Sequence, residues 1–225
     1  MKKDSAPKYN LNQDKVYPKY ISDGMNVFER NIKRTFDFIL ASCALVILSP
    51  LFVCCYIAVK WEDHGPIIFK QERIGYFGKP FYILKFRTMK LDAEKCGPEL
   101  FQGEGKDPRL TKVGEFLRMR HLDELPQLWN VVKGDMSFVG PRPERKFYIK
   151  QIEEKDPRYY ILYQIRPGLT SYATVYNGYT DTIEKMVTRL RYDLFYYQHR
   201  SWAFDLKILF KTFAYMVSGH KPSWK

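Results

Sequence analysis

The longest apolar run of the chain extends from Phe36 to Val59 and carries a single charge, Asp37, near its start. Its length is close to the roughly 20 residues that a helix needs to cross a bilayer. Hydropathy alone favours a plain single-span anchor. However, Ser49-Pro50 lies in the middle, where proline removes one helical hydrogen bond, so we expect a kink. The Ser49 hydroxyl can satisfy a carbonyl group that this kink frees.

Basic residues lie on both sides of the apolar run. Five lysines stand among the first 20 residues, and Lys60, Lys70 and Arg73 follow the run. The positive-inside rule therefore gives no direction for a crossing. This pattern favours a kinked helix that dips into one leaflet and returns, with both ends on the cytoplasmic side, over a helix that spans the bilayer.

After the apolar run the pattern becomes strand-like. Residues 66–75 and 79–89 are two β-rich runs, and the turn between them, Tyr76-Phe77-Gly78, is bracketed by glycines. This pattern predicts a β-hairpin.

Loop-like and helical patterns make up the rest of the chain. Residues 91–110 combine glycine, proline and mixed charge, which predicts a surface loop. Residues 111–133 are helical in two pieces, with Thr111 as the cap of the first and Pro126 in the first turn of the second. Three further helical stretches are predicted at 143–163, 181–199 and 201–218.

The last helical stretch carries a stripe of large apolar residues at helical spacing. Such a stripe is most often core packing, and membrane contact is the alternative. Its members are Trp202, Leu206, Leu209, Phe210 and Phe213.

Together these patterns predict an α+β fold that is mostly helical with a β-hairpin. Residues 1–29 are interpreted as a loosely ordered basic arm, 30–60 as a re-entrant (monotopic) membrane helix, and 61–225 as one compact cytoplasmic domain.

Charge narrows the kind of partner. The 225 residues include 37 Lys plus Arg against 25 Asp plus Glu, a net charge of +12, while the 45% apolar content excludes wholesale disorder. Such an excess of positive charge indicates a polyanionic binding partner: nucleic acid, an anionic membrane surface or a phosphorylated substrate. A merely soluble basic surface is the alternative. Aromatic residues reach 16%, which suits work at an interface.

The four cysteines show neither CxxC nor Cys/His ligand spacing, which argues against a disulfide framework and a structural zinc site. The expected environment is a reducing cytosol. They are Cys43, Cys54, Cys55 and Cys96.

The densest chemical segment contains the adjacent carboxylates Asp123 and Glu124. Two neighbouring carboxylates repel unless cations or a metal offset them, and they suit Mg²⁺ completed by substrate phosphate oxygens. A carboxylate can also attack phosphorus, and guanidinium groups bind phosphate in a bidentate manner. On spacing alone, a solvated ion-pair cluster remains an equal alternative. The cations nearby in sequence are Arg118, Arg120, His121, Lys133 and Arg142.

Five segments together resemble the bacterial sugar transferase family, the monotopic polyprenyl-phosphate phosphoglycosyl transferases. The resemblance covers about residues 30–217. It rests on KRTFDF, the apolar Ser-Pro segment, KFRTM, LDELPQLWNVVKGDMSFVGPRP and RPGLT. It implies transfer of a sugar 1-phosphate from a nucleotide diphosphate sugar, usually a UDP-sugar, to polyprenyl (undecaprenyl) phosphate, with release of UMP.

The resemblance also assigns roles to the carboxylates. The family's catalytic dyad matches Asp123-Glu124, so Asp123 is expected to attack the donor β-phosphate and form a covalent phosphosugar intermediate. Glu124 is expected to support it, and Mg²⁺ is expected at this carboxylate pair together with the diphosphate.

Further site residues follow from the same resemblance. Arg118 and Arg142 match arginines expected to contact phosphate, and Lys85 and Arg87 lie in the matching KFRTM strand and are expected to face the same pocket. Asp193 matches a late acidic position whose role is open. Ser49-Pro50 matches the break in the family's re-entrant helix.

One segment departs from the family pattern. Many members carry an arginine after the RPG motif, whereas residues 171–180 contain none. This indicates a different donor sugar or a compensating cation such as Arg189 or Arg191. Three tyrosines are candidates for stacking on the base or sugar, with simple exposure as the alternative: Tyr172, Tyr176 and Tyr179.

The expected protein is thus an enzyme of the inner membrane with its catalytic domain facing the cytoplasm. Its expected partners are the nucleotide sugar, polyprenyl phosphate and the bilayer, without nucleic acid; a homodimer is left open. The expected pathway is exopolysaccharide, capsule or glycoconjugate synthesis. The rivals are a basic membrane-surface or nucleic-acid-binding module without catalysis, and a single-span hydrolase.

Overall fold

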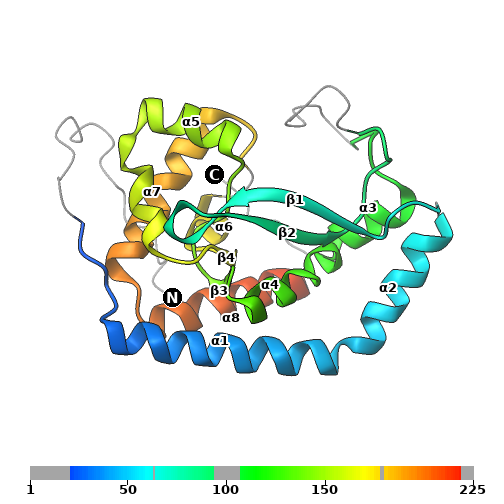
Figure 1. Cartoon of the computed structure of the whole chain (residues 1–225), viewed down its shortest axis with the longest axis horizontal. Helices are drawn as coiled ribbons and strands as arrows, with labels where there is room; N and C mark the ends of the chain where they lie inside the picture. The colour runs from blue at the N-terminus through cyan, green and yellow to red at the C-terminus, as the bar shows by residue number, and fades with distance from the viewer. Residues whose placement is uncertain (1–20, 63, 94–106, 178–179, 219–225) are drawn as a thin grey trace.

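The computed structural model describes residues 21–62, 64–93, 107–177 and 180–218. Two helices, α1 (Val27–Ile47) and α2 (Ser49–Glu62), form one side and one end of the molecule, as Figure 1 shows. The other elements are β1 (Ile68–Ile74), η1 (Tyr76–Gly78), β2 (Pro80–Phe86), α3 (Lys112–Met119), η2 (Leu122–Glu124), α4 (Gln127–Lys133), β3 (Ser137–Val139), α5 (Lys146–Lys155), η3 (Pro157–Gln164), β4 (Gly168–Thr170), α6 (Tyr172–Asn177), α7 (Ile183–His199) and α8 (Trp202–Ser218).

The described residues are mostly helical and contain two sheets of two strands each. The antiparallel pair β1–β2 is the predicted hairpin, in a register that pairs Ile68 with Phe86 and Ile74 with Pro80. Its turn is tight, because Phe77 and Gly78 adopt positive φ angles of 56° and 69°. The predicted α+β class, mostly helical with a β-hairpin, is therefore confirmed.

The predicted kink lies between α1 and α2, which are bent by 63°. Pro50 has no amide hydrogen for the carbonyl oxygen of Val46, and the Ser49 hydroxyl donates to that oxygen instead at 2.8 Å. Among the described residues no single helix is long and apolar enough to cross a membrane, although this bent pair passes by length and composition. The kink and its hydrogen bond are confirmed, and membrane insertion stays a prediction.

The helix pair begins before the apolar run because a capping box starts it. The Asn26 side chain accepts from the Glu29 amide, and the Glu29 carboxylate accepts from the Asn26 amide, both at 2.9 Å. The helical structure therefore includes the polar turn that carries Arg30, Lys33 and Arg34.

One face of the helix pair packs against the rest of the molecule. Ala41 of α1 is fully buried against Val131 of α4 and Ile83 of β2. Cys55 and Val59 of α2 pack with Phe86 and with the α3 residues near them. The opposite face exposes large apolar side chains, which are Phe36, Phe38, Ile39, Leu40, Val46, Ile47, Val53, Tyr56, Ile57 and Trp61.

The helix α8 corrects the expectation for its apolar stripe. Core packing is wrong for Leu206, Phe210 and Phe213, which are 57%, 75% and 65% exposed. The face that turns inward instead carries Asp205, whose carboxylate bonds to other helices, and the fully buried Ile208. The buried face of α8 thus includes a polar group that has hydrogen-bond partners, whereas most of the apolar stripe lies on the exposed face.

Two short strands and one short helix were not predicted. β3 and β4 pair in parallel, with Ser137 opposite Gly168, and α6 follows β4 directly. A Cβ atom on Gly168 would lie 2.2 Å from the amide nitrogen of Gly140, so only glycine permits this approach. Strands of three residues are too short for a periodic signal.

Candidate active site

The two adjacent carboxylates lie in a short turn between helices α3 and α4. Thr111 caps α3, because its hydroxyl accepts from the Gly114 amide at 2.9 Å. After α3 the chain reverses at His121, which adopts a left-handed conformation with φ of 55°. The 3-10 turn η2 follows and presents Asp123 and Glu124 beside strand β2.

Glu124 is held by a lysine from the hairpin. The Lys85 ammonium lies 2.5 Å from Glu124 Oε1. Burial raises the pKa of Glu124, but Lys85 and the nearby Arg142 outweigh it and bring the pKa to about 2. Glu124 is therefore ionised at neutral pH and paired.

Asp123 has a different environment. It is 4% exposed, and within the described residues no hydrogen bond or ion pair engages its carboxylate. Burial raises the pKa of Asp123, and Glu124 adds to the rise, while Lys85 and Arg118 oppose it. A carboxylate that is more basic than usual and has no partner is available to attack an electrophile.

Two arginines complete this surface. Arg118 in the last turn of α3 and Arg142 after β3 are both exposed. Arg118 lowers the pKa of Asp123, and Arg142 lowers that of Glu124. The structure thus brings Lys85, Arg118 and Arg142 around the two carboxylates, and His121 joins them through the same turn.

Arg87 lies apart from this group. Its guanidinium packs on Gly65, where an added Cβ would be 2.0 Å from Arg87 Nη1. Arg87 is buried, and Lys85, not Arg87, is the strand residue that bonds to Glu124. Alternation places Arg87 on the same side of the strand as Lys85, but its longer side chain turns to the α2–β1 connection.

A second group of charges is buried behind the Pro-Arg-Pro segment. The Glu144 carboxylate accepts a hydrogen bond from Arg189, which also donates to the Thr180 hydroxyl. The same Glu144 carboxylate lies 3.7 Å from the guanidinium group of Arg73. Arg73 further donates to the Pro143 carbonyl at 3.0 Å. These bonds fix the two residues that follow Arg142 in the chain.

Asp193 lies at the centre of this buried group on α7. Burial raises its pKa to about 8, Glu144 adds to the rise, and Arg189 and Arg142 oppose it. Its Oδ1 atom is buried without a hydrogen-bond partner in the described part of the chain. Asp193 therefore belongs to the support of the Arg142 segment, and the structure does not bring it into the group around Asp123.

The comparison with known proteins agrees with this geometry. A model of the family described as bacterial sugar transferase matches residues 28–219. The chain belongs to this family.

Relatives of the family differ in the sugar that their names contain. The chain is 43% identical over 186 residues to a UDP-glucose:undecaprenyl-phosphate glucose-1-phosphate transferase of Escherichia coli K12, covering 81% of this chain and 39% of that protein. It is 42% identical to a protein of the same name from Caulobacter vibrioides, covering 80% and 67%. A UDP-N-acetylgalactosamine-undecaprenyl-phosphate N-acetylgalactosaminephosphotransferase of Aeromonas hydrophila is 37% identical, with coverage of 84% and 44%. The chain thus spans about two fifths of the first of these relatives.

The structure places several of the residues considered for the departure from the family pattern at residues 171–180. Arg189 is buried and committed to Glu144 and Thr180, so it does not replace the absent arginine at the surface. Tyr172 is neither a stacking platform nor exposed, because it is buried in an aromatic cluster with Phe195 and Phe204. Tyr176 is half-buried and accepts from Lys211, while Tyr179 and Cys96 lie outside the described residues.

The donor set at the dyad fits Mg²⁺ only in part. In the described ranges no group of three or more His, Cys, Asp or Glu residues could hold a metal ion. Asp123 supplies an unengaged carboxylate and Glu124 a second one, and magnesium takes one or two carboxylates with substrate phosphates and water. The residues therefore fit a magnesium ion that the substrate completes.

Proposed function

We propose that this chain is a phosphoglycosyl transferase that moves a sugar 1-phosphate from a UDP-sugar to polyprenyl phosphate, undecaprenyl phosphate by analogy with the relatives' names. The observation that carries the proposal is the contrast within the dyad. Glu124 is paired with Lys85, whereas the neighbouring Asp123 carboxylate is unengaged and more basic than usual. The family match and the names of the relatives support the same reaction.

The reaction would proceed in two displacements at one phosphorus atom. An Asp123 oxygen attacks the β-phosphorus of the donor, and the bond from that phosphorus to the oxygen shared with the α-phosphate breaks, so UMP leaves. A phosphate oxygen of the polyprenyl phosphate then attacks the same phosphorus. The bond to Asp123 breaks, which regenerates the carboxylate and yields the polyprenyl diphosphate sugar.

The cations around the dyad have separate tasks in this scheme. Arg118 and Arg142 are exposed and would bind the diphosphate oxygens, whose charge grows during each displacement. Lys85 would keep Glu124 ionised and in place. Asp123 and Glu124 would hold Mg²⁺, which supplies charge neutralisation of the diphosphate when bound. Activity should then vanish in EDTA and return with Mg²⁺.

The decisive experiment separates transfer from binding and from hydrolysis. Purified protein is incubated with a panel of UDP-sugars, with and without undecaprenyl phosphate. UMP release together with sugar label in the organic phase supports the transferase. A protein that only binds releases no UMP, and a hydrolase leaves sugar phosphate in the water layer. With donor alone, the protein should gain the mass of one sugar phosphate.

We further propose that the α1–α2 pair enters the cytoplasmic leaflet and returns, with the catalytic part on the cytoplasmic side. The exposed apolar faces of α1 and α2, the 63° bend and the exposed Phe210 and Phe213 of α8 support this placement. It would bring a lipid phosphate and a soluble nucleotide sugar to one site, at the start of surface polysaccharide synthesis. Single cysteines at Ser22 and Lys70 in a cysteine-free background should be protected alike from an external, impermeant reagent. Labelling of position 22 alone would mean that the pair crosses the bilayer.

A further inference from the structure

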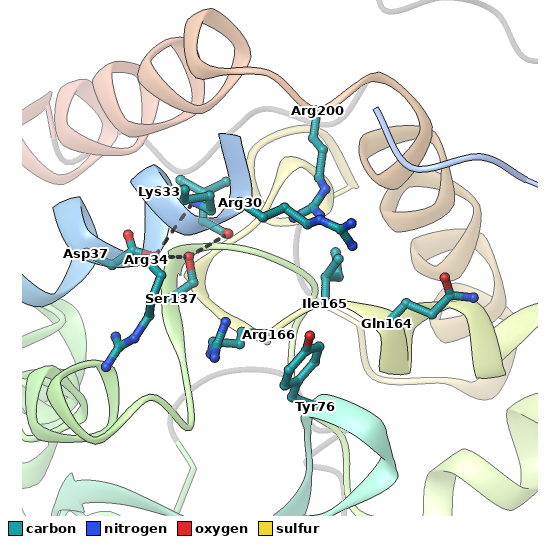
Figure 2. Close-up of a pocket in the computed structure, with 11 residues that line it drawn as sticks. Arg30, Lys33, Arg34, Asp37, Tyr76, Ser137, Gln164, Ile165, Arg166 and Arg200 are labelled. Carbon is teal, nitrogen blue, oxygen red and sulfur yellow. Dashed lines mark hydrogen bonds and ion pairs between the residues drawn. The ribbon is translucent and has the colours of Figure 1, made fainter. Parts of the chain in front are cut away.

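A positively charged pocket lies between α1 and the tip of the β-hairpin, away from Asp123 and Glu124. Its volume is about 40 Å³, and neither Asp123 nor Glu124 lines it. Figure 2 shows its side chains around an open space, with Arg30 and Arg200 on one side and Arg166 and Tyr76 on the other. Five separate segments of the chain therefore place polar groups at one point.

Arg30 and Arg200, on one side of the pocket, share one carboxylate. Arg200 donates to both oxygens of Asp23, at 2.6 and 2.5 Å, and Arg30 lies 3.4 Å from the same carboxylate. Two guanidinium groups thus face one negative charge, which leaves one positive charge in excess on this side.

Two further cations of the pocket, Arg34 and Arg166, are held by backbone carbonyl groups at the end of α4. Arg34 donates to Val131 and Val132 at 2.6 and 2.8 Å, and Arg166 donates to Gly134 at 2.9 Å. Burial lowers the pKa of Arg34, and the neighbouring charge of Arg166 lowers it further. Asp37 and Asp135 oppose this fall. The two like charges still repel each other, and an anion bound between them would offset that repulsion.

The carboxylates near this wall are already engaged. Asp37 accepts from the Ser137 hydroxyl at 2.7 Å, and Asp135 lies 3.3 Å from Lys133. The remaining cation, Lys33, is paired with Asp205 at 2.6 Å. Within the described residues, neither Arg34 nor Arg166 has an ion pair with a carboxylate, so the pocket keeps a positive excess.

We propose that this pocket is a second phosphate-binding site, distinct from the site around Asp123. Guanidinium groups bind phosphate oxygens with charge-assisted hydrogen bonds, and Arg166 is fixed over the Tyr76 ring, 4.8 Å from its centroid. The volume admits one small anionic group and is far below that of sites that enclose a whole small molecule. A phosphate monoester or diester group therefore fits, and a nucleotide sugar does not.

The phosphate has two sources, a phospholipid headgroup or a free phosphate. The helix α1 turns Arg30, Lys33 and Arg34 to the pocket, while Ile32 and Ile39 are exposed on the opposite face. If α1 lies in the leaflet surface, as the membrane placement proposed above requires, the pocket is at the depth of headgroups. Binding of free phosphate needs no membrane, so the site itself does not depend on that placement.

The test measures binding and not transfer, so it can fail or succeed independently of the proposed activity. Delipidated protein in detergent is mixed with phosphatidylglycerol, and retained lipid is counted by native mass spectrometry. In a second arm, inorganic phosphate replaces chloride at constant ionic strength, and the shift in melting temperature is recorded. The variants are Arg30→Gln, whose side chain is 39% exposed, and Arg166→Gln. Lys150→Gln, an exposed lysine on α5, is the control for one lost charge.

A headgroup site predicts that both variants retain phosphatidylglycerol about tenfold more weakly, as expected for one lost charge-assisted contact, while Lys150→Gln behaves as wild type. A free-phosphate site predicts that inorganic phosphate raises the melting temperature of wild type and of Lys150→Gln by clearly more than that of Arg30→Gln, with lipid retention equal in all. Phosphate bound near Asp123 contributes equally to every variant and cancels. If no arm distinguishes Arg30→Gln from Lys150→Gln, the pocket is not a phosphate site.

Discussion

The turn that carries Asp123 and Glu124 and the buried network around Glu144 and Asp193 both place two carboxylates among basic side chains. At the turn the arginines are exposed and one carboxylate has no described partner. In the network Arg189 is buried and bonded to Glu144 and Thr180, and Arg73 exposes only 16% of its side chain. Composition is nearly the same, so the access of the arginines to solvent decides which cluster can take a ligand.

The two clusters are also connected. Arg142 is exposed toward the dyad, but the residues after it in the chain, Pro143 and Glu144, are bonded to Arg73 and Arg189. The buried cluster therefore positions an arginine that the exposed cluster uses. This division predicts that substitutions in the first cluster change activity at constant stability, and that those in the second change stability.

The largest effect is expected for Asp123→Asn. The amide is a far poorer nucleophile, so transfer should fall by at least about a thousandfold, or roughly 4 kcal/mol. Folding should survive, because burial penalises the carboxylate charge and Asn removes it; the melting temperature should stay equal or rise. Donor-dependent UMP release and thermal unfolding give the two readings. A tenth of wild-type turnover in this variant would remove Asp123 from the role of nucleophile.

Glu144→Ala should have the largest effect on stability. It leaves the buried guanidinium groups of Arg73 and Arg189 without their carboxylate, which costs about 3–5 kcal/mol. Urea unfolding checks this value, with Glu154→Ala, an exposed residue of α5, as the surface control. A loss below about 1 kcal/mol would contradict the assignment of this cluster to structural support.

Arg118→Ala and Arg142→Ala should each reduce transfer by about 2–3 kcal/mol of transition-state stabilisation. Both side chains are exposed, so the unfolding midpoint should not move. The exposed neighbour Arg120, replaced in the same way, is the matched control. Equal kcat/KM values for all three variants would deny Arg118 and Arg142 a specific phosphate contact.

A further effect, which appears only as a slope against pH, is a change in the pH dependence of stability. The pKa of Asp193 is raised to about 8 from its ordinary 3.8, so between these values the folded protein holds a proton that the unfolded chain has released. Stability should therefore fall as pH rises through this window. Asp193→Asn should flatten the slope of the urea midpoint between pH 5 and pH 8, whereas Asp181→Asn at the surface should not. An unchanged slope in Asp193→Asn would mean that Asp193 is ionised in the folded state.

The sequence predicted the elements that have a long or strongly punctuated pattern. The hairpin, α7 and α8 have nearly the expected bounds, and Ser49-Pro50 marks the bend with the expected hydroxyl bond. Thr111 caps α3 as expected. These features depend on residues close together in the chain, so local stereochemistry fixes them. The placement of the basic arm, the membrane and the magnesium ion stay predictions.

The residue types at the site were equally readable, since an Asp-Glu pair within a long family motif is specific. Which arginine serves the site was not readable. Arg118 and Arg189 are the same residue type, yet one is exposed beside Asp123 and the other is buried in an ion pair with Glu144. Likewise Arg34 and Arg166 meet only because α1 and the segment before β4 both reach the end of α4.

By itself, then, the sequence determined the longer helices and the hairpin, the bend, and the adjacent carboxylates Asp123 and Glu124 as the candidate site. The tertiary structure alone decided that Asp123 is unengaged while Glu124 is paired, that α8 turns Asp205 inward and Phe210 outward, and that Ser137 pairs with Gly168. The physical reason is that burial and charge pairing depend on groups distant in the chain. Their free energies are as large as those of local preferences, so only the packed molecule settles which polar group finds a partner.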